Sequence, residues 1–589
     1  MDTADSIGGC RRWLVSAAMG LTLFLLMAHA AKAEEPTPAA QPATTQPAAA
    51  TPVAEVKGDP SGTDMSGPLY TPNGWLSGWA DGSMDEQGNY TGWKTDQKDL
   101  NEQFKKNIAH TAYSVNMVWT LVCGFLVMFM QAGFALVETG LCRAKNAAHV
   151  MAMNFLVYAL GMTGFFICGY AIMCGGPNGT NIGGPGPLGG IPVLNDMVKI
   201  GDWGIMGKTG FFLSGKSYDA AAIVWFLFMM VFMDTTATIP TGALAERWSF
   251  KSFFIFSLFI GGLIYPMYGC WVWGGGWLAQ LGSLAGLGHG AVDYAGSSVV
   301  HLQGGAIALI TCAMLGPRIG KYGSDGKPRP ILGHHMPMVF VGTFILAFGW
   351  FGFNAGSSLA GTDSRIGVVA VNTMLASAAG TLASCIYMWF RFGKPDPSMM
   401  CNGMLAGLVA ITAPCAFVAP WAAFLIGAIA GVLVVWSVFF WEKIGIDDPV
   451  GAISVHGVNG LWGILALGLF ADGTYGAGWN GVGYNSYLGA AGQGVTGLFY
   501  GDAKQLLAQG IAAVTCITWN VVAAGVIFWA IGKVLGTNRV APEFELAGLD
   551  IPELGAPGYP EFITPVAPEQ VPEAEVEAAK KAVHKHAFA

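Results

Sequence analysis

The sequence predicts an all-α protein that crosses a membrane many times, and three observations carry this prediction. The chain of 589 residues is 53% hydrophobic, only 11% charged, and contains 84 glycines. Soluble domains hold about 25% charged residues and about 7% glycine. Between Ala112 and Gly536, apolar runs of spanning length alternate with short polar breaks. We therefore assign residues 111–539 to an integral membrane domain.

The apolar runs divide into eleven predicted transmembrane helices. The predicted spans are 113–137, 146–174, 219–242, 251–273, 296–316, 336–357, 366–390, 402–417, 419–441, 453–471 and 508–534. The eighth run is short and is interrupted by Pro414. Eleven is an odd number of spans, so the two ends of the membrane domain are expected on opposite sides of the bilayer.

Residues 1–33 have the pattern of a secretory signal peptide. Two arginines precede an apolar run from Trp13 to Met27, and a small-x-small cleavage pattern ends at Ala33. The segment 34–110 begins as an Ala/Pro/Thr-rich linker, which cannot bury a core, and continues as a small insert rich in Gly, Asp and Trp. We expect this segment to lie outside the cytoplasm.

Basic residues orient the predicted helices. Lys and Arg gather in alternate breaks, whereas the other short breaks hold little more than Arg365 and Lys504. Because cytoplasmic loops carry the excess of positive charge, the basic breaks are predicted to be cytoplasmic. The N-terminus is then outside and the C-terminus inside, which agrees with the signal peptide.

Composition and motifs argue against several classes of function. The net charge is −8 without a long basic run, which speaks against a nucleic-acid partner. The eleven cysteines stand mostly singly in apolar runs, so no disulfide framework or CxxC site is indicated. The Gly-x-Gly-x-x-Gly match at 184–189 has no strand before it and is no dinucleotide fingerprint. No cofactor is predicted, and no nucleophile-base set or metal triad indicates an enzyme.

Two histidines stand inside apolar runs, where an ionisable side chain is costly and points to function. His301 follows Asp293 by eight residues, and His456 follows Asp448 by the same spacing. At about 1.5 Å per residue, each histidine lies roughly 12 Å deep in a core about 30 Å thick, from opposite faces. The two rings are therefore expected to meet near the midplane. An inverted repeat of five plus five helices, with one extra C-terminal helix, would produce this arrangement.

Three interpretations of the histidine pair remain open at this point. The rings can line a substrate path, brace the helices, or bind zinc or copper. A metal would need further ligands, and no third His, Cys or carboxylate lies at matching depth in the sequence. No metal site is therefore predicted.

Aromatic side chains are abundant in the predicted spans, whereas the inner spans hold only Glu138 and Asp234 as acidic residues. A channel for hydrated metal cations would need rings of carboxylates or carbonyls. Aromatic faces attract a small cation by about 0.5–2 kcal/mol per contact. The cation would still cross an apolar bore at high cost. A species that leaves its proton outside would cross much more easily.

Seven collinear stretches of the chain resemble the ammonium transporter (Amt/Rh/Mep) family, of the bacterial Amt type. They are 131-QAGFALVETGLCRAKN-146, 242-GALAERWSF-250, 293-DYAGSSVVH-301, 349-GWFGFNAGS-357, 368-VVAVNTMLASAAGTL-382, 447-DDPVGAISVHG-457 and 545-ELAGLDIPELGAPGYPEF-562. The resemblance implies a homotrimer of eleven-helix subunits in the bacterial cytoplasmic (inner) membrane. Each subunit would hold its own narrow apolar pore.

The resemblance also assigns roles to residues near the outer face. Phe232, Trp273 and Ser357 resemble a recruitment site, where aromatic faces and a hydroxyl hold ammonium. Phe232 and Phe353 resemble the paired phenyl gate beneath that site. Asp293 resembles the buried carboxylate close to it, whose role is partly structural and partly electrostatic.

His301 and His456 resemble the twin histidines that line the pore of the family. The implied mechanism binds ammonium outside, removes its proton at the gate, and passes ammonia along the two rings. The proton either returns or follows a separate polar route, so electrogenic and net-neutral transport both stay open. The rings are also expected to fix each other's tautomers and to titrate as a coupled pair.

The tail 540–589 resembles a cytoplasmic regulatory tail, which packs under a neighbouring subunit and meets PII signal proteins. Two other functions remain open. A receptor would bind ammonium and signal without flux. An Rh-type gas channel or a methylamine-preferring carrier would differ in selectivity.

Overall fold

The computed structural model describes residues 97–175, 197–218, 220–363, 365–477, 479–482, 494–560 and 570–587. These residues belong to one compact unit, Gly58–Phe588. The predicted signal peptide and residues 34–96 of the predicted linker and insert lie outside the described residues.

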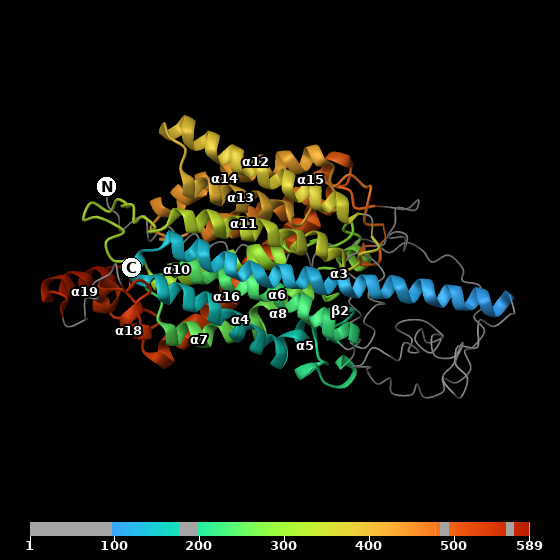
Figure 1. Cartoon of the computed structure of the whole chain (residues 1–589), viewed down its shortest axis with the longest axis horizontal. Helices are drawn as coiled ribbons and strands as arrows, with labels where there is room; N and C mark the ends of the chain where they lie inside the picture. The colour runs from blue at the N-terminus through green and yellow to red at the C-terminus, as the bar shows by residue number, and fades with distance from the viewer. Residues whose placement is uncertain are drawn as a thin grey trace. The chain divides into compact units, whose positions relative to one another are not determined.

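The described chain is almost entirely helical (Figure 1). Its helices are α3 (Gln97–Leu141), α4 (Ala147–Gly164), α5 (Tyr170–Cys174), α6 (Ala220–Ala243), α7 (Phe250–Phe259), α8 (Tyr265–Val272), α9 (Leu281–Ala285), α10 (Gln303–Leu315), α11 (Met336–Phe353), α12 (Ile366–Phe392), α13 (Pro397–Ile411), α14 (Pro420–Lys443), α15 (Asn459–Phe470), α16 (Ala503–Leu535), α17 (Pro542–Ala547), α18 (Asp550–Leu554) and α19 (Glu573–Ala587). Strands β1 (Met197–Ile200) and β2 (Trp203–Gly207) pair antiparallel.

Wider π-helical turns extend four of the membrane helices. They are Phe165–Gly169 between α4 and α5, Ile260–Ile264 between α7 and α8, Ser297–Leu302 before α10, and Ile453–Val458 before α15. Such turns often occur at functional positions. The last two contain His301 and His456, so both histidines lie in a widened first turn of their helix.

Ten helices of the described chain are long and apolar enough to cross a membrane, and ten of the predicted spans match them closely. The remaining prediction, 402–417, is displaced: the helix there is the shorter α13, which starts at Pro397. The Asp396 side chain caps this start by accepting a hydrogen bond from Met399 N. Beyond Ile411 the chain turns, as expected near Pro414.

The first span also begins differently from its prediction. Helix α3 starts at Gln97, so residues 97–110 are a helical lead into the span and not the end of a separate insert. This segment contains no Pro or Gly and is rich in Gln, Glu and Lys, which favour helix.

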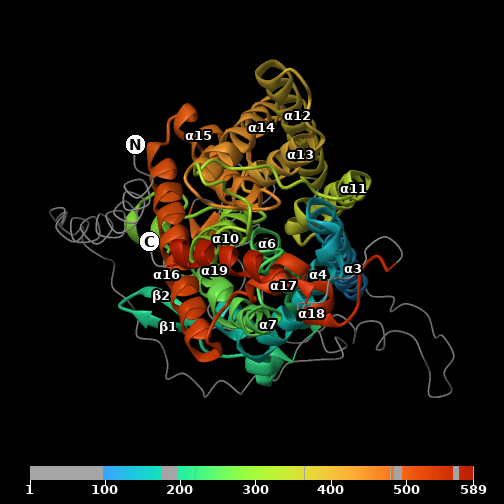
Figure 2. The ribbon, with the colours of Figure 1, turned by 90° about the vertical axis from the view of Figure 1, so that its left-hand side faces the viewer.

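Close helix packing in the bundle depends on glycine. A Cβ atom on Gly342 of α11 would lie 2.7 Å from the carbonyl oxygen of Gly133 in α3. A Cβ atom on Gly427 of α14 would lie 2.2 Å from the carbonyl oxygen of Ala376 in α12. Small residues let membrane helices approach in this way. Helices α12, α13 and α14 accordingly lie side by side in both views (Figures 1 and 2).

Large apolar side chains are exposed on the outward faces of the bundle. Phe390 of α12 is 90% exposed, Phe155 of α4 79%, and Trp529 of α16 56%. Apolar exposure on this scale is unfavourable in water and suits contact with lipid. The chain is therefore a multi-pass membrane protein.

The tail after α16 docks on loops of its own chain. Glu545 accepts a hydrogen bond from Ile319 N at 2.7 Å. Asp550 accepts hydrogen bonds from the backbone N–H groups of Ala148 and His149 at the start of α4. Glu553 accepts one from Phe250 N. These contacts fix residues 545–553 against one end of the membrane helices.

Candidate conduction pathway

The structure brings the two predicted histidines into direct contact. Their Nδ1 atoms lie 3.1 Å apart, and the ring centroids are 5.2 Å apart with an interplanar angle of 26°. His301 is fully buried and His456 is 4% exposed. The close approach depends on Gly305 of α10, because a Cβ atom there would lie 2.2 Å from the Cα atom of Gly457.

Each histidine belongs to a segment that begins with a capping aspartate. We call residues 293–301 the Asp293 segment and residues 448–456 the Asp448 segment. In both, the glycine three residues after the aspartate has a positive φ, 115° at Gly296 and 81° at Gly451. In both, the carboxylate then accepts hydrogen bonds from the N–H groups of the next helical turn. The spacing from aspartate to histidine therefore reflects the same local backbone geometry.

The Asp293 carboxylate satisfies the free N–H groups at the start of its helix. Oδ1 accepts from Gly296 N and Ser297 N, both at 2.9 Å. Oδ2 accepts from Ser298 N and Ser298 Oγ at 2.7 Å and from Val299 N at 3.0 Å. Burial raises the pKa of Asp293 and outweighs these hydrogen bonds, which lower it.

The Asp448 carboxylate is a cap of the same kind. It accepts hydrogen bonds from Val450 N at 3.2 Å, Gly451 N at 3.0 Å and Ile453 N at 2.7 Å. Burial raises the pKa of Asp448 as well, again against the backbone hydrogen bonds.

An aromatic group lies on the Asp293 side of the histidine pair. Phe232 of α6 stacks on Phe353 of α11, with centroids 4.1 Å apart and planes 23° apart. The Trp273 ring meets Phe232 edge to face at 5.9 Å, and its Nε1 donates to the Asp293 carbonyl oxygen at 2.7 Å. Ser357 lies one turn beyond Phe353 and donates to the Phe353 carbonyl oxygen at 2.7 Å.

The aromatic group continues directly into the histidine pair. The His301 ring stacks on Phe353 at 5.4 Å and on Trp350 at 5.3 Å. On the other side, His456 lies 6.0 Å from the Phe134 ring. Phe232, Phe353, His301 and His456 therefore form one unbroken series of rings. The predicted gate, histidines and recruitment aromatics are all brought together, with Ser357 at the edge of the group.

Sequence reasoning assigned no role to Trp350 and Phe134. Trp350 lies three residues before Phe353, and this spacing puts both on one helix face, so a face analysis of the stretch 349–357 could have identified it. Its Nε1 donates to Thr412 Oγ1 at 2.9 Å, which fixes the indole beside His301. Phe134 carries no such signal, because its contact with His456 crosses between distant parts of the chain.

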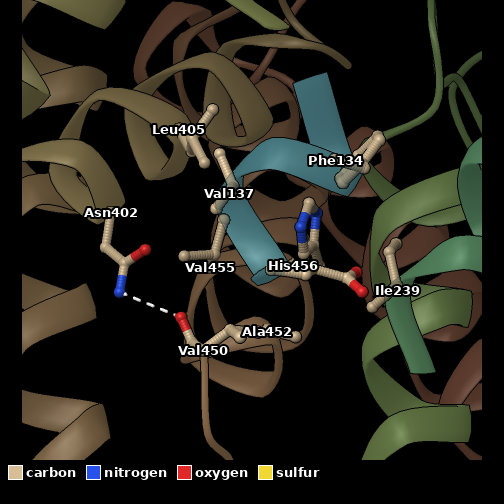
Figure 3. A pocket seen from close by; sticks show the side chains of 10 residues that line it. Phe134, Val137, Ile239, Asn402, Leu405, Val450, Ala452, Val455 and His456 are labelled. Carbon is tan, nitrogen blue, oxygen red and sulfur yellow. Dashed lines mark hydrogen bonds between the residues drawn. The ribbon is translucent and has the colours of Figure 1, made fainter. Parts of the chain in front are cut away.

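A cavity adjoins His456 (Figure 3), and its lining includes none of Phe232, Phe353 and Trp273. Its lining residues are Phe134, Val137, Glu138, Ile239, Asn402, Leu405, Val450, Ala452, Val455 and His456. The lining is apolar apart from the imidazole, one amide and one carboxylate. Asn402 Nδ2 donates to the Val450 carbonyl oxygen at 3.2 Å. Glu138 is the acidic residue of the lining.

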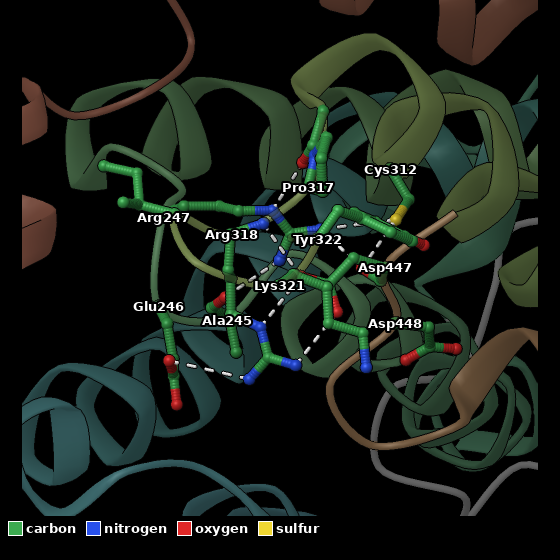
Figure 4. Close-up of polar contacts among 12 residues, drawn as sticks. Ala245, Glu246, Arg247, Cys312, Pro317, Arg318, Lys321, Tyr322, Asp447 and Asp448 are labelled. Carbon is green, nitrogen blue, oxygen red and sulfur yellow. Dashed lines mark hydrogen bonds and ion pairs between the residues drawn. The ribbon is translucent and has the colours of Figure 1, made fainter. Parts of the chain in front are cut away.

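A buried ionic cluster holds the loop in front of the Asp448 segment (Figure 4). Arg318 Nε and Nη2 each lie 2.9 Å from an oxygen of Asp447, and Arg318 Nη1 lies 3.5 Å from Glu246 Oε2. Burial alone would raise the pKa of Asp447, but Arg318 holds it well below its usual range. Arg247 Nη2 donates to the Asp447 carbonyl oxygen at 2.6 Å. The cluster therefore anchors the loop that leads to His456.

The charged groups do not supply a metal site. Among the residues that the structure describes, no group of three His, Cys, Asp or Glu side chains converges as metal ligands. The two imidazoles face each other through Nδ1 instead.

The fold and the site together indicate a class of protein. A bundle of membrane-spanning helices encloses a narrow series of aromatic and imidazole rings, which is what a transport protein for a small solute requires. Residues 118–559 match the family model described as Ammonium Transporter Family. The chain belongs to the ammonium transporter family.

Individual relatives agree with this membership. The chain is 48% identical to ammonium transporter Amt2 of Archaeoglobus fulgidus over 452 residues, which cover 76% of this chain and 89% of the relative. It is 39% identical to ammonium transporter Amt1 of Haloferax mediterranei over 476 residues, 78% and 82% of the two chains. These relatives are named as transporters and not as enzymes.

Solved structures share the fold. A structure titled "Sensor Amt Protein" is 33% identical, with a TM-score of 0.63 over 76% of this chain and 99% of that one. Mep2 of Saccharomyces cerevisiae is 26% identical, with a TM-score of 0.59 over 72% of this chain and 87% of that one.

Proposed function

We propose that the protein carries ammonium across the membrane by separating it from its proton. Ammonium is held outside at the aromatic group and gives its proton to water on the outer side, where hydronium forms, and ammonia passes along His301 and His456. The observation that carries this proposal is the series of stacked rings from Phe232 and Phe353 to the hydrogen-bonded histidine pair. Family membership supports ammonium as the substrate.

The aromatic group supplies the first step. The faces of Trp273 and Phe232 attract a small cation, and each such contact is worth about 0.5–2 kcal/mol. Ser357 adds a hydroxyl oxygen, whose lone pairs stay available because its proton is donated to Phe353. The stacked rings of Phe232 and Phe353 offer nothing to replace the water around a cation. Ammonium therefore gains by giving up its proton before it passes them.

The histidine pair supplies a polar line through the apolar bore. With both rings neutral, one Nδ1–H donates to the other Nδ1, so each ring fixes the tautomer of its neighbour. One Nε2 is then a donor and the other an acceptor, and ammonia can both donate and accept. His301 Nε2 is buried and has no hydrogen-bond partner within the described residues. It is the atom that ammonia would meet first after the phenyl rings.

The proposed assembly follows the resemblance described above. Helix α13 completes a set of eleven membrane helices, with the N-terminus outside and the C-terminus in the cytoplasm of a bacterial cell. The equivalent caps of the Asp293 and Asp448 segments support an inverted repeat of five plus five helices, with α16 as the extra helix. We further propose a homotrimer in the cytoplasmic membrane, whose tail after Val540 binds a PII-type signal protein.

The proposal is tested by currents on solid-supported membranes after an ammonium jump, with reconstituted wild type and His301→Ala. We expect a saturable wild-type current that falls at least about tenfold in the variant, because the polar line is broken. A liposome pH assay follows net proton movement. The matched control is His149→Ala, a second fully buried histidine, whose ring packs on Phe250 and not on the pathway. Equal currents in wild type and His301→Ala would contradict the mechanism.

A receptor is the second candidate function, because one 33%-identical structure is titled a sensor protein. The same assays separate the two functions. Ammonium binding to the wild type, without current and without a change in liposome pH, would reject transport and favour the receptor.

A further inference from the structure

Glu138 is a buried carboxylate that the mechanism above leaves without a task. It lies near the end of α3, is 3% exposed, and lines the cavity that adjoins His456. None of the ion pairs among the described residues involves Glu138. A carboxyl group buried at membrane depth without a basic partner is costly when it is charged. It is therefore a candidate for a group that holds and releases a proton.

The hydrogen bonds around Glu138 allow both states of the carboxyl. Asn154 Nδ2 donates to Oε2 at 2.6 Å, and Thr241 Oγ1 lies 2.8 Å from Oε2 and 3.0 Å from Oε1. Thr241 Oγ1 also contacts the carbonyl oxygen of Thr238. A hydroxyl has one proton, so it can donate either to the carboxylate or to the carbonyl. When it donates to the carbonyl, a protonated Glu138 can donate to Thr241 Oγ1.

The glycine at position 242 leaves room for the Glu138 carboxyl. A Cβ atom on Gly242 would lie 3.0 Å from both Cδ and Oε1 of Glu138 and 2.6 Å from Val450 Cγ2. The carboxyl therefore lies where Gly242 of α6 passes close to Val450 of the Asp448 segment.

The groups that face Glu138 provide little compensation for a negative charge. His456 stands on the same cavity, and Asp448 is close enough for its negative charge to act on Glu138. The Cys142 thiol follows at the end of α3 and is itself acted on by Glu138. The neutral polar groups there come from α4, α6 and α13 and are Asn154, Thr241 and Asn402.

We infer that Glu138 is the proton donor that converts ammonia back to ammonium in the cavity beyond His456. The inference rests on the proposed function. Ammonia that passes His456 enters the cavity and accepts the carboxyl proton. The Glu138 O–H bond breaks as an N–H bond forms, and ammonium leaves a carboxylate behind. The carboxylate then takes a proton from hydronium on the cytoplasmic side, which restores the starting state.

A purely structural role is the competing explanation, since Glu138 links α3, α4 and α6 through Asn154 and Thr241. The isosteric Glu138→Gln variant separates the two roles. Its amide oxygen still accepts hydrogen bonds, so bracing is largely kept, but the amide exchanges no proton at these pH values. Asp234→Asn is the matched control, because Asp234 is a second buried acid of the membrane helices, 2% exposed, that does not line the cavity.

The experiment measures ammonium-jump currents of full-length wild type, Glu138→Gln, Glu138→Asp and Asp234→Asn in proteoliposomes. The pH on the cytoplasmic face is varied between about 5 and 8. We expect the Glu138→Gln current to be at least about tenfold smaller and nearly independent of that pH. Glu138→Asp should keep part of the current with a displaced pH profile, and Asp234→Asn should match the wild type.

Each outcome supports or overturns the role of Glu138 as proton donor. A Glu138→Gln variant with wild-type current and pH profile overturns the inference, and so does an Asp234→Asn variant that loses as much current. If Glu138→Gln does not fold, as judged by gel filtration, Glu138→Asp decides by whether its pH profile shifts. A wild type that binds ammonium without any flux rejects the proposed function itself, and the inference with it.

Discussion

The Asp293 and Asp448 segments begin their helices with the same capping geometry but in different surroundings. Asp293 is fully buried and accepts five hydrogen bonds, one of them from the Ser298 hydroxyl. Asp448 is partly exposed and accepts three from the backbone, and its position equivalent to Ser298 is Ile453. The Asp293 segment is held by densely packed neutral groups. The Asp448 segment is held by the charged loop in front of it.

The surroundings of the two histidines differ accordingly. The His301 ring is enclosed by Trp350 and Phe353, whereas His456 borders a cavity that contains a carboxyl group. The comparison suggests a division of tasks. In the proposed mechanism, the Asp293 side excludes water and strips the substrate of its proton. The Asp448 side would admit water and return the proton.

The largest expected effect is that of Asp293→Ala on stability. The substitution leaves four buried N–H groups without an acceptor, and each such group costs about 1–3 kcal/mol. We expect the free energy of unfolding to fall by about 4 kcal/mol or more. The loss is followed as a shift of the thermal unfolding midpoint in detergent, recorded by intrinsic tryptophan fluorescence. Asp448→Ala should cost clearly less, because water can reach its partly exposed cap. Equal losses in the two variants would contradict the comparison.

The second prediction concerns pH and has opposite signs at Asp447, in the charged loop before the Asp448 segment, and at Asp293. The folded-state pKa of Asp447 is lowered by Arg318, so its stabilisation is complete above the unfolded pKa of about 3.9. That stabilisation is lost as the pH falls from there toward the folded-state pKa. The folded-state pKa of Asp293 is raised by burial, so its ionised form costs stability at neutral pH. That cost is relieved as the pH falls through the folded-state pKa toward about 3.9.

The measurement is the unfolding midpoint of wild type, Asp447→Asn and Asp293→Asn between about pH 7 and pH 3. The midpoint of wild type minus that of Asp447→Asn should decrease as the pH falls. The midpoint of wild type minus that of Asp293→Asn should increase. Each unit of pKa displacement corresponds to about 1.4 kcal/mol. If both differences change in the same direction, Asp447 and Asp293 do not differ in the proposed way.

The sequence predicted the membrane helices and the main rings well, for physical reasons. Lipid requires long apolar runs, so ten spans could be located within a few residues. Two ionisable rings in such runs were predicted to meet, and their Nδ1 atoms lie 3.1 Å apart. Helix α13 was misplaced because a short, largely buried helix needs no spanning run. Its start depends on the Asp396 cap instead.

What the sequence missed depends on contacts between distant segments. Glu138 was visible as an acid in an apolar span, but its place beside His456 follows only from how α3 meets the Asp448 segment. The ion pair of Arg318 with Asp447 likewise joins residues far apart in the chain. The equal spacing from aspartate to histidine is visible in the sequence, but the positive φ of Gly296 and Gly451 that explains it was not predicted.

The smallest effect, Ser298→Ala, sharpens the comparison most directly, because it makes the Asp293 cap resemble the Asp448 cap. The variant removes the 2.7 Å hydrogen bond from Ser298 Oγ to Asp293 and keeps the four backbone donors. A hydrogen bond to a charged group is worth about 1.5–3 kcal/mol. We expect about 1.5 kcal/mol, because Tyr268 O–H, which lies 3.0 Å from Ser298 Oγ, still has the Ala512 carbonyl oxygen as an acceptor. The unfolding midpoint in detergent measures this loss, with Ile453→Ala as the equivalent change in the Asp448 segment. If Ser298→Ala is as stable as wild type, the fifth hydrogen bond does not distinguish the two caps, and the difference between the segments must come from their burial and their surroundings.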